Sequence, residues 1–187
     1  MIFIEAGLPG AYFIDIERLM DERGFFARAW CQREFTECGL DAQIVQCNIS
    51  YNKHKGTLRG MHLQLPPFSE AKLMRCTRGA VYEVLIDLRY DSPSFLKWVS
   101  VELSADNRRA VFVPKGFAHG FQTLEDDTEV FYQMSEFYSL ESGRGVRWND
   151  PLFNIPWPLE VSVISEKDQN YADFLPENFP GLAMEMK

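Results

Sequence analysis

The sequence predicts an all-β domain in which antiparallel strands form a barrel with Greek-key or jelly-roll connections. Aromatic residues are abundant, with 15 Phe, 7 Tyr and 4 Trp, and strands accommodate broad rings on their pleated faces. Short apolar or alternating segments recur along the chain, and turn-forming residues separate them. The chain has 187 residues, 46% of them hydrophobic, which suits one domain (1–187) with a substantial core.

Eight segments have the composition and spacing of strands. In chain order, these segments are residues 42–50, 56–64, 71–76, 80–88, 98–104, 109–114, 119–124 and 128–138. Turn signals such as Pro66-Pro67 and Asp106-Asn107 lie between them. The segments therefore account for most of the expected barrel.

Two segments depart from the strand pattern. Residues 31–40 space Phe35 and Cys38 at helical intervals and carry Gly39 at the position of a C′ glycine, which predicts a short helix. The last residues, 163–187, contain prolines and few periodic signals. We expect this C-terminal segment to wrap the barrel rather than extend it.

Composition excludes several classes of partner. The net charge is −8 and the isoelectric point is near 4.9, which argues against a surface for nucleic acid. A phosphate-bearing ligand would have to be held locally by a few arginines and lysines. The four cysteines form no C-x-x-C pair, as in reduced cytoplasmic proteins. The N-terminus has no signal-peptide pattern, and no apolar run approaches the roughly 20 residues of a membrane span.

The stretch GTLRGMHLQLPPFSEAKLMRCTRG (residues 56–79) resembles the metal-binding frame of cupin barrels, G-x5-H-x-H-x3-4-E-x6-G. The spacing from Gly56 to His62 fits, and so does the spacing from Lys72 to the closing glycine. However, Gln64 occupies the position of the second histidine, and Lys72 occupies that of the glutamate. An ammonium group cannot ligate a cation. We therefore expect neither a metal site nor a cofactor.

A second half-motif surrounds His119 in PKGFAHGF, although Arg108 and Thr123 replace the expected glycine and asparagine. His62 alternates with Leu58, Gly60 and Gln64, which predicts one shared strand face. If that face borders a cavity, His62 is available for chemistry; a hydrogen-bonded core histidine fits the spacing equally well.

A histidine, a lysine and a tyrosine in one cavity would suit proton transfer beside a carbonyl group. His62 could abstract a carbon-bound proton, and Lys72 could stabilise the resulting enolate. Tyr132, which shares a strand face with Val130 and Met134, could return a proton. Taken alone, Tyr132 fits a core tyrosine with a satisfied hydroxyl group better than it fits an acid.

The sequence from about residue 20 to about residue 170 resembles the dTDP-4-dehydrorhamnose 3,5-epimerase family, a branch of the cupins. The resemblance rests on long, irregular stretches: DERGFFARAW, QCNIS, KGTLRGMHLQ, KLMRCTRGAVYEVLIDLR, SPSF, VELSADNRR, VPKGFAHGF, RGVRWNDP and ISEKD. It implies a cupin-type jelly-roll barrel. It also implies that His62 is the base, Asp168 its carboxylate partner, Lys72 a neighbour of the sugar carbonyl and Tyr132 the acid.

The resemblance implies a nucleotide site as well. The matching positions are Arg59 at the diphosphate, His119 and Lys167 beside it, Gln46 and Asn48 of the Q-x-N motif, Tyr138 on the sugar or base, and Arg23 and Phe26, which reach a neighbouring subunit. The last pair implies a homodimer. Two positions depart from the family pattern, because Arg28 and Gly143 stand where many or some members carry glutamate.

The sequence therefore predicts an isomerase that inverts C3 and/or C5 of a nucleotide-linked 4-keto-6-deoxyhexose through enolates. A relative that inverts one centre, or that uses another nucleotide, would need the same base and acid. A non-catalytic sugar-nucleotide-binding cupin is the alternative from a different class, and a metal-dependent cupin oxygenase is a third.

Overall fold

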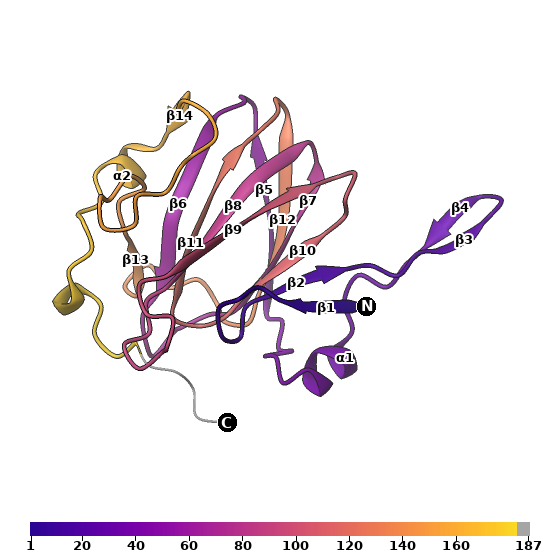
Figure 1. The fold of residues 1–187 in the computed structure, drawn as a ribbon, viewed down its shortest axis with the longest axis horizontal. Coiled ribbons are helices and arrows are strands. Elements are labelled where there is room, and N and C mark those ends of the chain that lie inside the picture. Colours follow the sequence, from indigo (N-terminus) through magenta and orange to yellow (C-terminus); the bar gives the residue numbers. More distant parts are fainter. Residues whose placement is uncertain (183–187) are drawn as a thin grey trace.

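The computed structural model describes residues 1–182, and all eight predicted strands are present (Figure 1). They are β5 (Gln46–Asn52), β6 (Thr57–Gln64), β7 (Lys72–Arg78), β8 (Ala80–Asp87), β9 (Trp98–Ser104), β10 (Ala110–Val113), β11 (Phe117–Thr123) and β12 (Thr128–Met134). The first begins four residues later than predicted, and the last ends four residues earlier. The other strand ends lie closer to their predicted positions.

Two sheets pack into a jelly-roll barrel of the cupin type. The first sheet has the order β1-β2-β10-β7-β12-β5, and the second has the order β13-β6-β11-β8-β9, with β14 parallel to β6. The sequence did not predict β1 (Ile2–Glu5), β2 (Tyr12–Asp15), β13 (Gly143–Gly145) or β14 (Val163–Ile164). Strands of two to four residues show little periodicity, and β10, which has four, was predicted from a longer apolar segment, residues 109–114.

The space between the sheets is apolar along part of the strands and polar toward one end. On the first sheet, Met74 of β7 and Val130 of β12 belong to the core, where they meet Leu85 of the second sheet. Further along the same inward faces stand Lys72 of β7 and Tyr132 of β12. Because side chains alternate along a strand, this change of composition leaves a polar cavity at one end of an apolar barrel.

Further layers cover the outer faces of both sheets. The predicted short helix is confirmed as α1 (Gln32–Glu37), and Gly39 adopts a φ of 70° just beyond its C-cap. Phe35 of α1 packs against Phe112 on the first sheet. The C-terminal segment wraps the second sheet, where Phe174 and Phe179 join Ile86 in an apolar cluster. This segment carries α2 (Glu166–Gln169) and the 3₁₀ helix η1 (Pro176–Asn178); residues 183–187 of the predicted wrap lie outside the described part.

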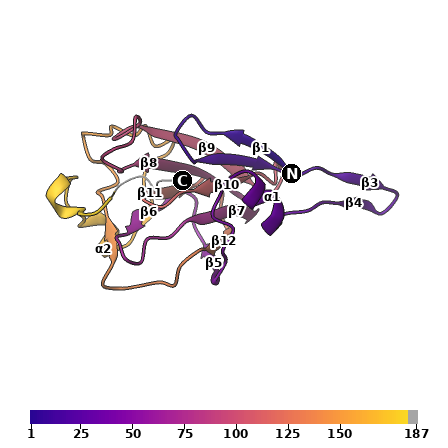
Figure 2. The same cartoon turned by 90° about the horizontal axis from the view of Figure 1, so that it is seen from below.

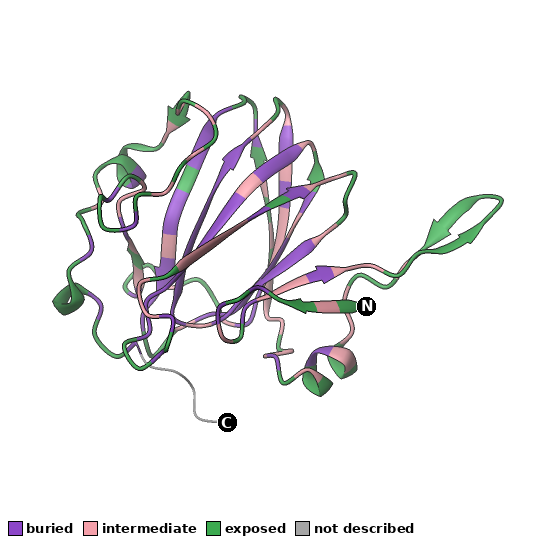
Figure 3. Cartoon of the chain, viewed as in Figure 1, coloured by how far each residue is buried: buried purple, intermediate pink, exposed green. Residues whose placement is uncertain are grey.

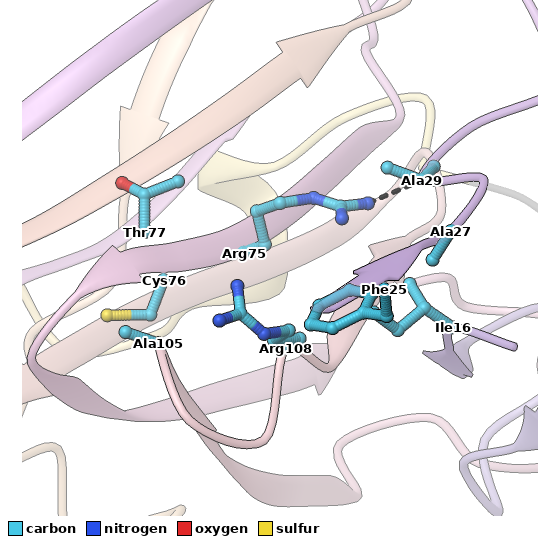
Figure 4. A pocket seen from close by; sticks show the side chains of 9 residues that line it. All are labelled: Ile16, Phe25, Ala27, Ala29, Arg75, Cys76, Thr77, Ala105 and Arg108. Atoms are coloured by element: carbon cyan, nitrogen blue, oxygen red, sulfur yellow. Dashed lines mark hydrogen bonds between the residues drawn. The ribbon is translucent and has the colours of Figure 1, made fainter. Parts of the chain in front are cut away.

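A hairpin of β3 (Leu19–Asp21) and β4 (Gly24–Phe26) extends away from the barrel in both views (Figures 1 and 2). Its residues are exposed (Figure 3). At its base is a hollow of about 230 Å³, where Arg75 donates to the carbonyl of Ala29 over 2.6 Å (Figure 4). The Arg108 guanidinium lies 4.9 Å from the centre of the Phe25 ring. These contacts fix the base of the hairpin and leave its tip free.

All four cysteines are free, as predicted. Among residues 1–182, no helix combines the length and the hydropathy that a bilayer crossing requires.

We predict that Phe174→Ala destabilises the fold by about 3–5 kcal/mol, because a large ring is removed from a filled cluster. The Phe174 ring stacks on Phe179 at 5.0 Å and meets Phe153 edge-on at 6.0 Å. Denaturant unfolding measures the change. The matched control is Leu175→Ala, since Leu175 is 49% exposed and its loss should change stability by less than about 0.5 kcal/mol. Equal effects of the two substitutions would show that the C-terminal segment does not contribute to the core.

Candidate active site

The polar end of the barrel contains a cavity of about 470 Å³. Nine of the twelve site residues predicted from the sequence line it: His62, Asp168, Lys72, Tyr132, Gln46, Asn48, Arg59, Tyr138 and Lys167. They come from both sheets, from the loop between β12 and β13, and from the C-terminal segment. The structure thus brings the four predicted catalytic residues to one site.

An irregularity in β6 decides which of its side chains reach the cavity. His62 pairs with His119 and Arg59 pairs with Phe121, so two residues of β6 lie opposite the single residue Gly120. Gly60 makes this possible, because a Cβ there would lie 2.5 Å from the Cα of Gly120. The bulge brings Arg59 and His62 to the same cavity although they are three residues apart.

The predicted alternation is therefore wrong at its start. Leu58 is buried away from the cavity, while His62 and Gln64 line it. Simple alternation cannot continue through a bulge, because the extra residue exchanges the two faces of the strand.

His62 and Asp168 form a hydrogen-bonded pair. Nε2 of His62 lies 2.7 Å from Oδ1 of Asp168, and the backbone N–H of Gly60 donates to Oδ2 over 3.2 Å. Burial raises the pKa of Asp168, but the hydrogen bonds from His62, Gly60 and Ser165 bring it below its ordinary value. An ionised Asp168 accepts the Nε2 proton of a neutral imidazole. The lone pair of His62 then resides on Nδ1.

The short helix α2 delivers Asp168 to His62. The Ser165 hydroxyl accepts the backbone N–H of Asp168 over 3.0 Å and so caps the helix. Lys167 lies on the same turn and also lines the cavity. The S-E-K-D sequence therefore combines a helix cap with two site residues.

Lys72 occupies the start of β7 and is held by two partners. Its ammonium lies 2.9 Å from Oε1 of Glu70 and 2.8 Å from Nε2 of His119. An ammonium group has three N–H donors, so these contacts leave one for a ligand in the cavity. Lys72 itself is only 8% exposed, so its ammonium is largely shielded from solvent.

His119 lies behind Lys72 and does not line the cavity. Burial, together with the charges of Lys72 and His62, lowers the pKa of His119 well below its ordinary value. Because a lysine ammonium can only donate, Nε2 of the neutral His119 accepts, and Nδ1 donates to Oε1 of Glu83 over 2.9 Å. Burial raises the pKa of Glu83 well above its ordinary value, against the influence of Lys72.

Tyr132 belongs to the first sheet, whereas His62 belongs to the second. Both line the cavity, so they approach a bound ligand from opposite walls. Burial raises the pKa of Tyr132 above its ordinary value, although the charge of Arg59 opposes this. The phenol therefore retains its proton at neutral pH and can donate it.

The edge strand β5 and the loop between β12 and β13 complete the first wall. Gln46 donates to Oδ1 of Asn48 over 3.1 Å and accepts the backbone N–H of Tyr138 over 3.2 Å. On the opposite side, Nε of Arg59 donates to Asn52 over 2.6 Å. Arg59, Lys72, Arg144 and Lys167 gather at the cavity of a chain whose net charge is −8. This concentration of cations suits a ligand with phosphate groups.

Arg23 and Phe26 do not reach this cavity. They lie on the projecting β3–β4 hairpin, where Arg23 pairs with Asp21 over 2.5 Å and Phe26 is 70% exposed. Within the described chain, neither residue lines the site.

Sequence reasoning missed several residues that shape the site: Glu70, Glu83, Met134, Arg144, Ser165 and Tyr171. Two of these had visible signals. Glu83 is a carboxylate within an apolar strand, and it is fully buried. Ser165 precedes Asp168 with the spacing of a helix cap. Tyr171 follows Asp168 by three residues and had no recognisable signal.

The two substituted positions of the cupin frame are occupied by groups that already have partners. Gln64 donates to the carbonyls of Phe68 and Phe137 and accepts the backbone N–H of Ser139. The Lys72 ammonium contacts Glu70 and His119. In residues 1–182, no group of three or more His, Cys, Asp or Glu residues is arranged to hold a metal ion.

A sequence model of the family described as dTDP-4-dehydrorhamnose 3,5-epimerase matches residues 5–175. This chain belongs to that family. A dTDP-4-dehydrorhamnose 3,5-epimerase from Shigella flexneri is 41% identical over 180 residues, covering 96% of this chain and 99% of the relative. The chain is thus an epimerase, which is a class of isomerase.

Solved structures of the family have the same fold. The Bacillus anthracis dTDP-4-dehydrorhamnose 3,5-epimerase, solved with TDP and pyrophosphate, has a TM-score of 0.89 and 40% identity; the match covers 92% of this chain and 99% of that one. The Legionella pneumophila epimerase in complex with dTDP-4-keto-L-rhamnose has a TM-score of 0.85 and 35% identity, with 92% of both chains covered.

Arg28 and Gly143, the two positions that depart from the family pattern, lie in different parts of the structure. Arg28 pairs with Glu34 over 2.5 Å on the surface. Gly143 lines the cavity at the end of β13 and pairs with Gln64. A Cβ at Gly143 would lie 3.4 Å from the carbonyl oxygen of Ser139, an ordinary van der Waals contact, so the space there does not by itself require glycine.

We predict that turnover is independent of metal ions, because Gln64 and Lys72 occupy the ligand positions and are engaged with protein partners. Purified protein should contain no stoichiometric transition metal, and incubation with a chelator should leave the rate unchanged. Loss of activity on chelation, with recovery on adding zinc, iron or manganese, would contradict this expectation.

Proposed function

We propose that this epimerase converts dTDP-4-dehydro-6-deoxy-D-glucose into dTDP-4-dehydro-L-rhamnose by inverting C3 and C5. The observation that carries the proposal is the position of His62 and Tyr132 on opposite walls of one cavity. Inversion requires a proton to leave one face of the sugar ring and another proton to reach the opposite face. Two acid–base groups on facing sheets meet this requirement.

In the first step, Nδ1 of His62 removes the proton from a carbon beside the C4 carbonyl group. Asp168 orients the imidazole and stabilises the imidazolium that forms. Both C3 and C5 flank the same carbonyl, so one base can serve both centres.

The electrons of the broken C–H bond move into an enolate whose negative charge lies on the C4 oxygen. The remaining N–H of Lys72 is the donor for this oxygen, and the lysine is buried, where such an interaction is strong. Glu70 and His119 keep the ammonium in place. Tyr132 then delivers its proton to the carbon from the opposite face. Proton exchange with solvent returns His62 to the neutral imidazole and Tyr132 to the phenol before the second centre reacts.

The nucleotide is held by the groups at the mouth of the cavity. Arg59 and Lys167 provide the cations for the diphosphate, while Gln46, Asn48 and Tyr138 border the same space. The chemistry moves protons only, so it requires no redox cofactor. The free cysteines fit a reducing compartment, and we place the enzyme in the cytoplasm.

We also infer a homodimer. The β3–β4 hairpin extends from the barrel (Figure 1), with Arg23 exposed in its turn and Phe26 exposed at the far end of β4. An exposed hairpin that carries an arginine and an aromatic ring would be suited to complete the nucleotide site of a second subunit.

A single-centre epimerase would use the same His62 and Tyr132, so it is the nearest alternative. A non-catalytic binding protein is disfavoured, because the His62–Asp168 pair and the Lys72 contacts are intact.

Incubation with dTDP-4-dehydro-6-deoxy-D-glucose in heavy water tests the function. We expect deuterium at both C3 and C5 of the product, detected by NMR. His62→Ala should reduce turnover by at least about a hundredfold, because the general base is lost, while nucleotide binding persists. Deuterium at one carbon alone would identify a single-centre epimerase. No exchange at either carbon would support a binding protein, and near-native turnover of His62→Ala would exclude His62 as the base.

Subunit mixing tests the shared site. His62→Ala and Arg23→Ala proteins, each weakly active at low substrate concentration, should regain activity when subunits exchange. A hybrid dimer has one site with an intact His62 and an intact Arg23 from its partner. Mixing should therefore restore up to about one quarter of native activity, since half of the dimers are hybrids with one site each. An active monomer in solution, or mixing without recovery, would contradict the arrangement.

A further inference from the structure

Tyr171 and Gly145 form a pair beside the His62 base. Gly145 of β13 lies directly opposite His62 of β6 in the strand pairing. Side chains at such paired positions are close neighbours, so the residue at 145 controls the space next to the imidazole. Glycine leaves this space empty of its own side chain, and the ring of Tyr171 occupies it.

The fit between these two residues is close. A Cβ on Gly145 would lie only 2.2 Å from Cε2 of Tyr171 and 2.3 Å from Cζ. The ring therefore rests against the backbone of β13, and any larger residue at 145 would displace it. From this position the Tyr171 ring meets the His62 imidazole edge-on, with 6.1 Å between ring centres and 72° between ring planes.

The chain around Tyr171 is anchored independently of the ring. The backbone N–H of Arg147 donates to the carbonyl of Ala172 over 3.2 Å, and Arg147 pairs with Asp173 over 2.7 Å. Burial raises the pKa of Tyr171 and lowers that of Lys167. The interaction of the phenol with the ammonium opposes both effects and leaves the pKa of Lys167 above its ordinary value. The ring thus contacts the base on one side, and the Lys167 ammonium lies 6.0 Å from the ring centre, within reach of an interaction with the phenol.

Tyr171 also stands between two hollows. It lines the active-site cavity and, with Gly143 and Arg144, a neighbouring hollow of about 510 Å³ that extends to Pro180. Removing the ring would open the His62 side of the cavity toward this second, more open space. Solvent would then have access to the base from behind.

We propose that Tyr171, seated on Gly145, is a positioning residue for the epimerisation: its ring orients His62 and closes the wall behind it, and its hydroxyl orients Lys167. This inference rests on the proposed role of His62 as the base. It predicts a separation of effects, because the ring acts on the chemical step and the hydroxyl acts on substrate binding.

Steady-state kinetics of three variants test the proposal. Tyr171→Ala should lower kcat about ten- to a hundredfold. This is the loss expected when a catalytic group, here the His62 imidazole, is displaced by up to about 1 Å. Tyr171→Phe should recover most of that kcat, because the ring is retained, and should raise KM about two- to fivefold through the lost contact with Lys167. Gly145→Ala, which displaces the ring, should lower kcat as Tyr171→Ala does.

The double variant Gly145→Ala/Tyr171→Ala is the control for an unrelated effect of the added methyl group. If Gly145 acts through the ring, the second substitution should add almost nothing to the first. Thermal unfolding checks that each variant folds. Should Tyr171→Ala fail to fold, Tyr171→Leu retains apolar volume without the aromatic edge and takes its place.

Additive effects of the two substitutions, or native kcat in a folded Tyr171→Ala protein, would overturn the positioning role. Wild-type enzyme and His62→Ala are measured in parallel with the same dTDP-linked 4-keto sugar. A wild-type protein that neither turns over nor exchanges protons would reject the proposed function itself, and an active wild type would confine the failure to Tyr171.

Discussion

The hydrogen bond between His62 and Asp168 joins parts of the chain that are 106 residues apart. Its 2.7 Å length depends on three features of the fold. The bulge at Gly60 turns His62 toward the cavity and supplies an N–H for the same carboxylate. Ser165 caps the short helix that carries Asp168, and the aromatic cluster around Phe174 holds the C-terminal segment against the barrel. The geometry of the site therefore depends on the wrapping segment as much as on the barrel.

The barrel in turn determines how the site can act. Its inward strand faces change from apolar to polar along β7 and β12, which creates a cavity with walls from two sheets. Buried polar groups must have partners, and here each partner has a consequence for chemistry. Glu70 and His119 hold Lys72 with one donor free, and burial keeps the proton on Tyr132. Two ligand positions of the cupin metal-binding frame are occupied here by Gln64 and Lys72, and both side chains are bound by other groups of the protein.

Much of this could be predicted from sequence, for identifiable reasons. Eight barrel strands and α1 were predicted because alternation, turn residues and the C′ glycine Gly39 are local signals. The short strands and the bulge were not, since a bulge at Gly60 depends on its close approach to Gly120 across the sheet. Asp168 was predicted only through the family resemblance, and Tyr171 was missed. Its contact with His62 depends on Gly145, a residue of a three-residue strand with no periodic signal.

The central claim is that His62 and Tyr132 act on opposite faces of the sugar, and one experiment in heavy water tests it directly. In Tyr132→Phe, His62 can still remove a proton and return deuterium to the face from which the proton came. Early in the reaction, NMR should therefore find deuterium in unepimerised substrate, with inverted product strongly reduced. Normal inversion by the variant would contradict the claim. Loss of both exchange and inversion, in a protein that folds and binds nucleotide, would equally contradict it and would assign Tyr132 to the base or to positioning.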